Sequence, residues 1–367
     1  MTFNAALDSI KTYEAGLPIE LVVREYGIQE NKVIKLASNE NPLGASKKAI
    51  HAIVQAAQNA YLYPDDSMYT LKESLSKHFN ISNDALIIGA GSDQIIDFCI
   101  HAKANSTSKV LMARTTFAMY EIYTKTVGAE ILRTPSHEHN LQEFLECYKT
   151  HNPSIIFLCT PNNPLGECLD SNEIFDFLKQ INSDCLVIID GAYQEYAQAK
   201  DPNKALNPKI LIETFPNVIY TGTFSKAYGL GGMRVGYGIA NPSIIQALLK
   251  LRPPFNITTP SLAAAIAALD DKEHLQKSIQ NNLEQMPLFE NFAKENGFGF
   301  TPSYANFITY YFKEPLSSTK IAEHLLKQGM IIRDLASYGL NAIRITIGTP
   351  TQNNKFFALF NAYLNKK

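Results

Sequence analysis

The sequence predicts an α/β protein in which a large domain has a mostly parallel sheet between helices and is followed by a smaller α+β domain. Apolar stretches of strand length alternate with amphipathic helical stretches from about residue 71 to about residue 240. These strands are continuous runs rich in Val, Ile and Leu, typical of a parallel sheet covered on both faces. Later the sequence changes to short strands and two helices, and 367 residues are enough for more than one domain.

The elements of the large domain follow one another along the chain. Strands are expected at residues 85–89, 109–113, 154–160, 185–190 and 217–223. Helices are expected at residues 90–102, 117–128 and 171–181. Residues 261–297 then form one long helical pattern, and we place the boundary between the two domains within it.

The smaller domain has its own set of expected elements. Short strands are expected at residues 306–312, 329–335 and 341–348, and helices at residues 317–329 and 353–367. We therefore predict an N-terminal arm over residues 1–30 that contributes to the small domain and to dimer contacts, a large domain over residues 31–284, and a small domain over residues 285–367.

Composition and charge argue against several classes of function. The formal net charge is −2 and no basic block occurs, so nucleic acid is not an expected partner. The longest apolar stretches are too short to span a membrane and the first 18 residues lack the order of a signal peptide, so we expect a cytoplasmic protein. The five cysteines never form C-x-x-C, so neither a disulfide framework nor a metal site is expected.

The segment Gly89–Asp93, between an expected strand and an expected helix, is the first candidate site. In an open parallel sheet, ligands bind outside the carboxyl ends of the strands. Small residues let the backbone approach an anion, and the helix N-terminus supplies free N–H groups, so a phosphate would fit. The alternative is that Ser92 or Asp93 is only a helix cap. The segment lacks the later glycine of a dinucleotide fingerprint, and the chain has no Walker loop.

Polar residues also follow two of the next apolar strands. Asn163, in "CTPNNPLG", could donate to a ligand oxygen, although Asn is also an ordinary turn residue. Asp190 ends the strand "LVIID", where a buried acid needs a cationic partner unless it only caps a helix. Tyr193, three positions on, could offer its hydroxyl to the same ligand.

Lys226 and Arg234 are the only charged residues of "TFSKAYGLGGMRVGYG". A lysine is most often on the surface, but Lys226 follows directly after a strand. Desolvation there would lower its pKa and favour the neutral amine that a Schiff-base nucleophile requires. Thr223, Ser225 and Arg234 could hold a phosphate nearby, because a guanidinium group forms paired, charge-assisted hydrogen bonds with it.

These features together match the requirements of pyridoxal 5'-phosphate (PLP), which needs an amine, an acid for its ring nitrogen and a phosphate anchor. From about Ser38 to the C-terminal helix, the sequence resembles the fold-type I, class I/II aminotransferases, and T-x-S-K followed by G-x-R-x-G-Y is the most specific mark. Within that family it is most similar to the enzymes that act on histidinol phosphate. The shared stretches are "ASNENPLG", "YPDD", "GAGSDQII", "TFAMY", "PNNPLG", "LRPPFN" and "IIRDL" followed by "IRITIGT".

The resemblance assigns a role to each candidate residue. It implies that Lys226 forms the Schiff base with PLP and that Arg234 binds the cofactor phosphate. Asp190 would pair with the ring nitrogen, and Tyr193 and Asn163 would share the phenolic oxygen.

It also implies further contacts. Phe117 would stack on the pyridine ring, the phosphate loop would include Gly91, Ser92 and Asp93, and Tyr63 would reach the phosphate from the partner subunit of a homodimer. The substrate-contacting positions would be Asn39, Arg333, Arg344 and, from the arm of the other chain, Tyr13.

Four residues depart from the family pattern and put the shape of the loops in doubt. Gly191 stands where the family usually has an acid, and Gln94 replaces a glutamate. Ala90 replaces a more polar residue, and Thr115 replaces a proline.

The implied activity is a ping-pong transfer of the amino group between histidinol phosphate and 2-oxoglutarate, with glutamate as the other amino compound, in histidine biosynthesis. An aromatic amino-acid aminotransferase or a threonine-phosphate decarboxylase would keep the same lysine, aspartate and phosphate-binding residues. A non-catalytic regulator on this fold is a further alternative, but it would need an added basic DNA-binding domain. A nucleotide-binding module would need a complete glycine fingerprint.

Overall fold

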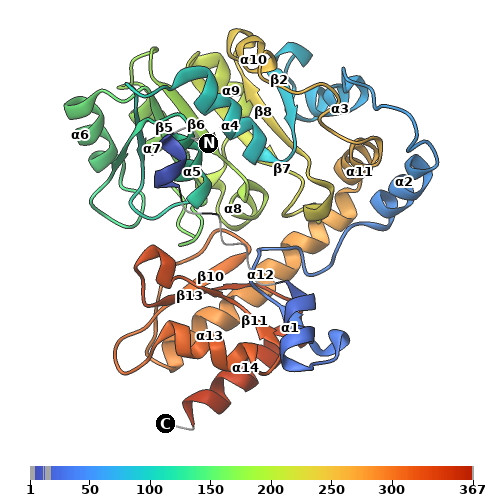
Figure 1. The fold of residues 1–367 in the computed structure, drawn as a ribbon, viewed down its shortest axis with the longest axis vertical. Helices are drawn as coiled ribbons and strands as arrows, with labels where there is room; N and C mark the ends of the chain where they lie inside the picture. Colours follow the sequence, from blue (N-terminus) through green and yellow to red (C-terminus); the bar gives the residue numbers. More distant parts are fainter. Residues whose placement is uncertain (1–4, 11, 13–17, 366–367) are drawn as a thin grey trace.

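A larger α/β unit and a smaller unit, joined by the long helix α12 (Lys272–Glu295), make up the computed structural model (Figure 1). The structure describes residues 5–10, 12 and 18–365. The predicted fold class is confirmed: the larger unit contains a mostly parallel sheet between helices, and the smaller unit contains a short antiparallel sheet and its own helices.

The sheet of the larger unit has seven strands in the order β2-β8-β7-β6-β5-β3-β4. Their bounds are β2 (Leu86–Gly89), β3 (Lys109–Met112), β4 (Glu130–Arg133), β5 (Ile155–Cys159), β6 (Leu186–Asp190), β7 (Val218–Thr223) and β8 (Gly236–Ala240). Strand β8 runs antiparallel to both its neighbours, and the other pairs of this sheet are parallel. The five predicted strands are present, whereas β4 and β8 were not predicted.

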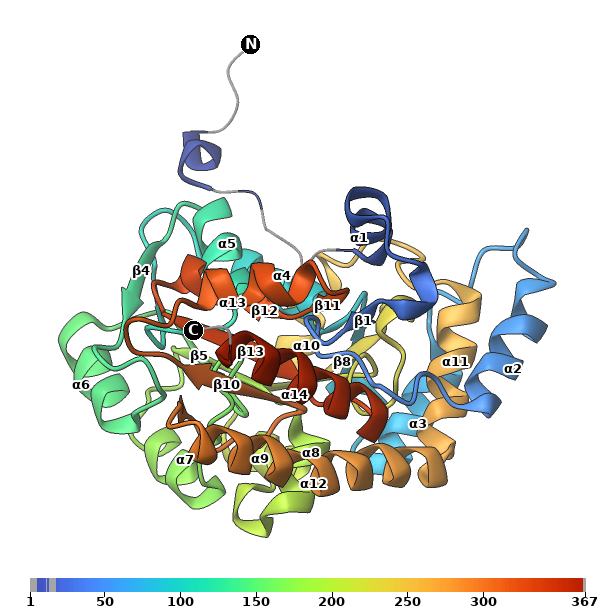
Figure 2. The same ribbon diagram turned by 90° about the horizontal axis from the view of Figure 1, so that it is seen from below.

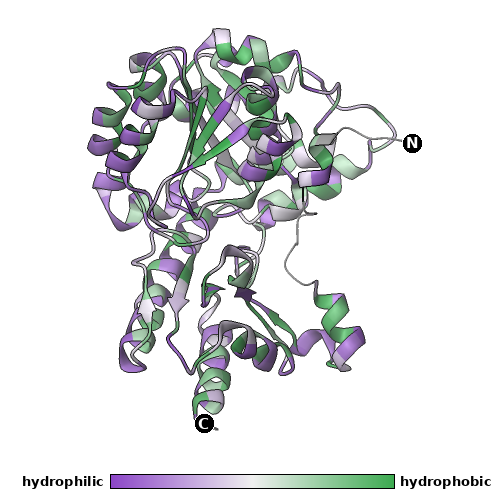
Figure 3. Cartoon of the chain, turned by 60° about the vertical axis from the view of Figure 1, so that its left-hand side comes forward, coloured by the Kyte–Doolittle hydropathy of each residue, from purple (hydrophilic) through white to green (hydrophobic). Residues whose placement is uncertain are grey.

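Helices cover both faces of this sheet because its strands are apolar on both faces. One hydrophobic cluster joins the sheet to α4 (Ser92–Lys103), α5 (Ala118–Thr126) and α10 (Pro242–Leu249). The cluster on the other face includes α2 (Lys47–Ala57), α3 (Tyr69–Phe79), α6 (Leu141–His151), α7 (Ser171–Leu178), α9 (Pro208–Thr214) and α11 (Thr259–Asp270). In Figure 3 the central strands are mostly hydrophobic, while the surrounding helices carry both colours. The helix α8 (Gln194–Lys200) follows β6.

The single helical pattern predicted over residues 261–297 is wrong, because the chain forms two helices there, α11 and α12. They are separated at Asp271, whose φ of −89° and ψ of 68° are not helical. The Asp271 side chain accepts a hydrogen bond from the backbone N–H of His274 at 3.4 Å and so caps α12. Aspartate favours such caps because its side chain replaces the missing partner of a first-turn N–H group.

The smaller unit contains a four-stranded antiparallel sheet in the order β12-β13-β10-β9. Its strands are β9 (Gly299–Phe300), β10 (Phe307–Tyr311), β12 (Arg333–Asp334) and β13 (Ala342–Thr346), and its helices are α13 (Ser318–Leu326) and α14 (Pro350–Leu364). A separate pair joins β1 (Ile34–Lys35) in parallel to β11 (Met330–Ile331).

Short 3-10 helices occur along the whole chain: η2 (Glu30–Lys32), η3 (Asn83–Ala85), η4 (Pro202–Lys204), η5 (Gly231–Met233) and η6 (Ala336–Tyr338).

The N-terminal segment contributes to both units. The helix α1 (Ile19–Tyr26) packs with Ala37 and Ile331 beside the smaller unit, whereas η1 (Ala5–Ser9) lies next to α5 of the larger unit (Figure 2). The domain limits at residues 31 and 285 stay a proposal. The pairing of β1 with β11 favours counting the segment around residue 34 with the smaller unit.

Candidate active site

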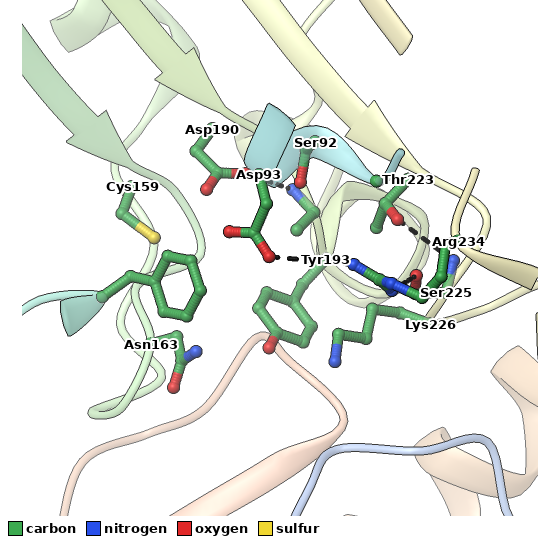
Figure 4. A pocket seen from close by; sticks show the side chains of 13 residues that line it. Ser92, Asp93, Cys159, Asn163, Asp190, Tyr193, Thr223, Ser225, Lys226 and Arg234 are labelled. Atoms are coloured by element: carbon green, nitrogen blue, oxygen red, sulfur yellow. Dashed lines mark hydrogen bonds and ion pairs between the residues drawn. The ribbon is translucent and has the colours of Figure 1, made fainter. Parts of the chain in front are cut away.

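One pocket lies at the carboxyl ends of the central strands β5, β6 and β7, beside the start of α4. It brings together eleven of the predicted residues: Gly91, Ser92, Asp93, Phe117, Asn163, Asp190, Tyr193, Thr223, Ser225, Lys226 and Arg234. Cys159 and Ala192 also line the pocket and were not predicted. In Figure 4 Asp190 lies at one edge of the pocket, and Lys226 and Asn163 lie at the opposite edge.

Lys226 follows shortly after β7, whose sequence "VIYTGT" is buried along its whole length. Its Nζ donates a hydrogen bond to the backbone oxygen of Ser38 at 3.3 Å and lies 5.7 Å from the centre of the Tyr193 ring. Burial, followed by the positive charge of Arg344, lowers the pKa of Lys226 to about 8. A sizeable fraction of this amine is therefore neutral near physiological pH, as a nucleophile or a base requires.

Asp190 is the last residue of β6 and is only 4% exposed. Its Oδ2 accepts a hydrogen bond from the Tyr120 hydroxyl at 2.6 Å, and its Oδ1 accepts one from the Ala192 N–H at 3.1 Å. Burial raises the pKa of Asp190, and these hydrogen bonds act in the opposite direction. A buried carboxylate at the pocket wall favours a ligand that presents a cationic N–H group.

The phosphate-loop residues and Arg234 form a cup beside the N-terminus of α4. Gly91 has a φ of 80°, a backbone conformation that favours glycine, and a Cβ atom there would lie 2.6 Å from Arg234 Nη2 and displace this guanidinium group. Arg234 Nη1 donates to Ser225 Oγ at 3.2 Å. Arg234 Nη2 lies 3.7 Å from Asp93 Oδ2, and burial raises the pKa of Asp93. The guanidinium group, hydroxyl group and helix N-terminus together suit a phosphate.

Two segments outside the central sheet complete the opposite edge of the pocket. Asn39 has a φ of 56°, and its Nδ2 donates to the Tyr193 hydroxyl at 2.9 Å. Arg344, on β13, donates to Asn163 Oδ1 and also to the Ala37 backbone oxygen at 2.6 Å. Asn39 and Arg344 were predicted from the resemblance to contact substrate, and the structure places both in direct contact with pocket residues.

The remaining predicted residues do not line this pocket. Arg333 borders a neighbouring cavity that shares Phe117 with it. That cavity is lined by four basic residues and one acid, namely Arg114, Lys125, Arg133, Arg333 and Glu121. Tyr63 is 82% exposed, and its ring stacks on Phe255 with centres 4.6 Å apart. Tyr13 lies outside the described residues.

Tyr120 is the main residue that the sequence reasoning missed, although "TTFAMY" contains it. It lies three positions after Phe117 on α5, and its hydroxyl reaches Asp190. Cys159 could have been found from strand alignment, because it is directly opposite Asp190 in the pairing of β5 with β6.

At the positions that depart from the family pattern, neighbouring side chains either fill the available space or form hydrogen bonds. A Cβ atom on Gly191 would lie 2.4 Å from the Tyr220 hydroxyl oxygen, so the tyrosine occupies the space of a larger residue. Gln94 Oε1 accepts from the Ala90 N–H at 2.8 Å and from Asn256 Nδ2 at 2.7 Å. Thr115 Oγ1 lies 2.7 Å from His137 Nδ1.

The described part of the chain contains neither a metal-binding cluster nor a membrane-spanning helix. Among residues 5–10, 12 and 18–365, no group of three or more His, Cys, Asp and Glu side chains is arranged to hold a metal ion. Over the same described residues, no helix is both long and apolar enough to cross a membrane.

Comparisons with known proteins agree in sequence and in fold. The profile of the class I and II aminotransferases matches residues 31–358. The histidinol-phosphate aminotransferase of Wolinella succinogenes is 59% identical over 366 residues, covering 100% of both chains. That of Aliarcobacter butzleri is 60% identical, covering 99% of both chains. A crystal structure of histidinol-phosphate aminotransferase from Sinorhizobium meliloti in complex with PLP superposes with a TM-score of 0.88 at 25% identity, over 99% of this chain and 96% of that chain.

Proposed function

The chain belongs to the class I and II aminotransferase family, and from this premise we propose that it transfers an amino group between histidinol phosphate and 2-oxoglutarate with PLP as cofactor. The proposal rests on one observation: a buried amine, a buried carboxylate and an anion-binding cup lie together in one pocket. Full-length relatives of that activity, about 60% identical, support the choice of substrate.

The pocket residues fit PLP group by group. The phosphate would be held by Arg234, Ser225 and the N–H groups at the start of α4, where glycine at position 91 leaves room for the guanidinium group. Asp190 would bind the ring nitrogen, and Phe117 would cover one face of the ring.

Tyr193 and Asn163 would contact the phenolic oxygen. When bound, PLP supplies a carbonyl carbon that reacts with amines and a ring that accepts the electron pair left at the substrate Cα.

Lys226 is the residue that would attach the cofactor and move protons. Its lowered pKa, about 8, leaves a sizeable neutral fraction near neutral pH, so Nζ could accept the proton released from the substrate Cα. The hydrogen bond to Ser38 and the nearby Tyr193 ring limit the directions in which this amine can swing.

Two guanidinium groups would recognise the substrates. Arg344 already donates to Asn163, so it lies where a substrate carboxylate or phosphate would meet the cofactor residues. Arg333 borders the basic cavity beyond Phe117, whose excess of positive charge suits an anionic substrate group. Histidinol phosphate and 2-oxoglutarate would use this site in turn, so the same groups would bind phosphate and carboxylate.

We also propose a cytoplasmic homodimer with shared active sites. Large apolar side chains are exposed along α2, the loop after it, the start of α3 and the segment before α11, namely Ile50, Val54, Tyr61, Leu62, Tyr63, Tyr69, Leu251 and Phe255. A surface of this kind on one chain is typical of a subunit interface. Tyr63 belongs to it, so a two-fold interface would allow Tyr63 to reach the cofactor phosphate of the partner.

A turnover assay with four substrates tests the activity. Purified protein with PLP would be given histidinol phosphate, histidinol, phenylalanine or threonine phosphate, and kcat/KM would be compared. We expect histidinol phosphate to be preferred and dephosphorylated histidinol to be poor, because the phosphate is the group that the arginines bind. Equal turnover of histidinol and its phosphate ester would reject phosphate recognition and favour an aromatic amino-acid aminotransferase.

A further inference from the structure

Tyr120 contacts both the acid and the aromatic residue of the cofactor pocket, although it does not itself line that pocket. Its hydroxyl donates a hydrogen bond to Asp190 Oδ2 at 2.6 Å. Its ring lies edge-on to Phe117, with centres 5.6 Å apart and an angle of 85° between the planes. Tyr120 therefore influences a bound ligand through these two neighbours.

The packing of Tyr120 fixes the position of its hydroxyl group. The side chain is completely buried, and its ring stacks on Phe157 with centres 4.2 Å apart and planes 3° apart. Phe157 lies in the middle of β5, next to the strand that carries Asp190. Because buried aromatic side chains have few alternative rotamers, the hydroxyl is held in one place as a donor.

Asp190 depends on this donor because burial removes its water. The two other donors to the carboxylate, the Ala192 N–H at 3.1 Å and the Thr221 hydroxyl at 3.5 Å, both contact Oδ1. Oδ2 accepts from Tyr120. A hydrogen bond given to the charged form of an acid stabilises that form. Burial and the charge of Asp190 raise the pKa of Tyr120 well above its usual value, so the tyrosine keeps its proton and remains the donor.

We propose that Tyr120 is a positioning residue that keeps Asp190 ionised and oriented toward the ring nitrogen of PLP. The inference rests on the proposed role of Asp190 as the partner of that nitrogen. Tyr120 thereby increases the affinity of the site for a protonated ring nitrogen. Its contact with Phe117 makes a purely structural role the alternative that an experiment must separate.

A cofactor analogue makes this separation possible. Deazapyridoxal phosphate has a C–H group in place of the ring nitrogen, so it keeps the phosphate, the carbonyl and the stacking face but cannot form the ion pair with Asp190. Dissociation constants of PLP and the analogue would be measured on the full-length apoprotein, for the wild type and for Tyr120→Phe. Phenylalanine keeps the ring contacts with Phe157 and Phe117 and removes only the hydroxyl.

We expect the wild type to bind PLP more tightly than the analogue, and Tyr120→Phe to reduce this preference about tenfold, or about 1.4 kcal/mol. Binding of the analogue should stay within about twofold of the wild type, because it never used the ion pair. Tyr310→Phe is the matched control, since it removes a buried hydroxyl that donates to the Phe289 carbonyl oxygen in the smaller unit at 2.7 Å. That control should leave both affinities unchanged.

Other outcomes overturn one or both claims. If Tyr120→Phe weakens both cofactors by the same factor, or changes neither, Tyr120 has no specific role through Asp190. If the wild type itself shows no preference for PLP, the proposed role of Asp190 fails as well. If Tyr120→Phe is not recovered folded, Thr221→Val is compared in the same way, because it removes the Oδ1 contact while keeping the shape of the side chain. A smaller but still PLP-selective loss supports the inference, and an equal loss for both cofactors rejects it.

Discussion

The two halves of the proposed active site are built from different parts of the molecule. The cofactor half lies at the ends of β5, β6 and β7 and at the start of α4, and the residues that line its pocket all come from one chain. The substrate half takes Asn39 from an N-terminal segment, and Arg333 and Arg344 from the smaller unit. We propose that Tyr63 of a partner chain adds a contact to the cofactor phosphate. The proposed chemistry therefore resides on a rigid sheet, whereas recognition depends on how separate units come together.

Substitution of Lys226 should have the largest effect, because it removes the attachment point and the base from the cofactor half together. Lys226→Ala should lose turnover by about 10⁴-fold or more. It should still bind PLP through the phosphate contacts of Arg234 and Ser225. Turnover and equilibrium dialysis measure these two effects, with the exposed Lys179→Ala as control.

Chemical labelling and pH dependence check the same residue. Borohydride treatment of the wild type with PLP should fix the cofactor on the peptide containing Lys226, and labelling of another lysine would reject the assignment.

Because the pKa of Lys226 is lowered to about 8, the rate at which PLP attaches to the apoprotein should rise about tenfold per pH unit below that value. Above about pH 8 the rate should level off, since the amine is then neutral.

Asp190→Asn should have the next largest effect and should also be confined to the cofactor half. An amide keeps the size of the side chain but removes the negative charge that would hold the proton on the ring nitrogen. We expect Cα proton removal, followed in single-turnover absorbance traces, to slow by about 10² to 10³-fold while the fold is retained. An unchanged single-turnover rate would show that this acid does not assist the reaction.

The position of the pocket could be predicted because most of its residues end or follow an apolar strand that is visible in the sequence, whereas Phe117 was predicted only from the family resemblance. Tyr120 could not be predicted, since its importance depends on the packing of α5 against β5 and β6. Strand β4 was missed because it lies at the edge of the sheet and is only partly buried. Strand β8 was missed because it contains two glycines, of which Gly236 passes so close to the phosphate loop that a Cβ atom would lie 2.3 Å from Ser92 N.

The substrate half was predicted only through family resemblance, and its arrangement depends on contacts between distant segments. Arg344 reaches Asn163 across 181 positions of sequence, and Asn39 reaches Tyr193 across 154. No local sequence pattern predicts a contact between residues so far apart, because the contact depends on how the smaller unit packs against the larger one.

Arginine substitutions should have intermediate effects, confined to the substrate half. Arg333→Lys and Arg344→Lys keep the charge but lose the planar pair of donors, so each should raise the KM for histidinol phosphate about tenfold. PLP affinity should change less, because neither arginine lines the cofactor pocket, although Arg344 contacts the pocket residue Asn163. A variant that loses PLP affinity as strongly as substrate affinity would show that the two halves are not separable.

Tyr63 should give the smallest effect per site, and it tests whether the contact to the cofactor phosphate crosses a subunit boundary. In its own chain Tyr63 is exposed and stacks on Phe255, and the nearby Asp66 pairs with Arg252 through two hydrogen bonds of 2.9 and 2.7 Å. These contacts stabilise the loop that contains Tyr63. We expect Tyr63→Ala to weaken PLP binding about fivefold, measured by dialysis, and Tyr26→Ala, an exposed tyrosine on α1 outside the proposed interface, to have no such effect.

Mixed dimers separate a contact across the interface from one within the chain. If Tyr63 serves the partner, a dimer of one Lys226→Ala chain and one Tyr63→Ala chain has one site with both defects and one with neither. At limiting PLP, refolding equal amounts of the two variants together should then restore about one quarter of wild-type activity, because about half of the dimers are mixed and each has one intact site. If Tyr63 serves its own chain, every site carries one defect and activity stays at the mean of the two parents. No recovery despite mixed dimers seen by differential tagging, or full activity of a monomer, would therefore remove the shared site, and the cofactor half would then belong to one chain, as the residues that line its pocket do.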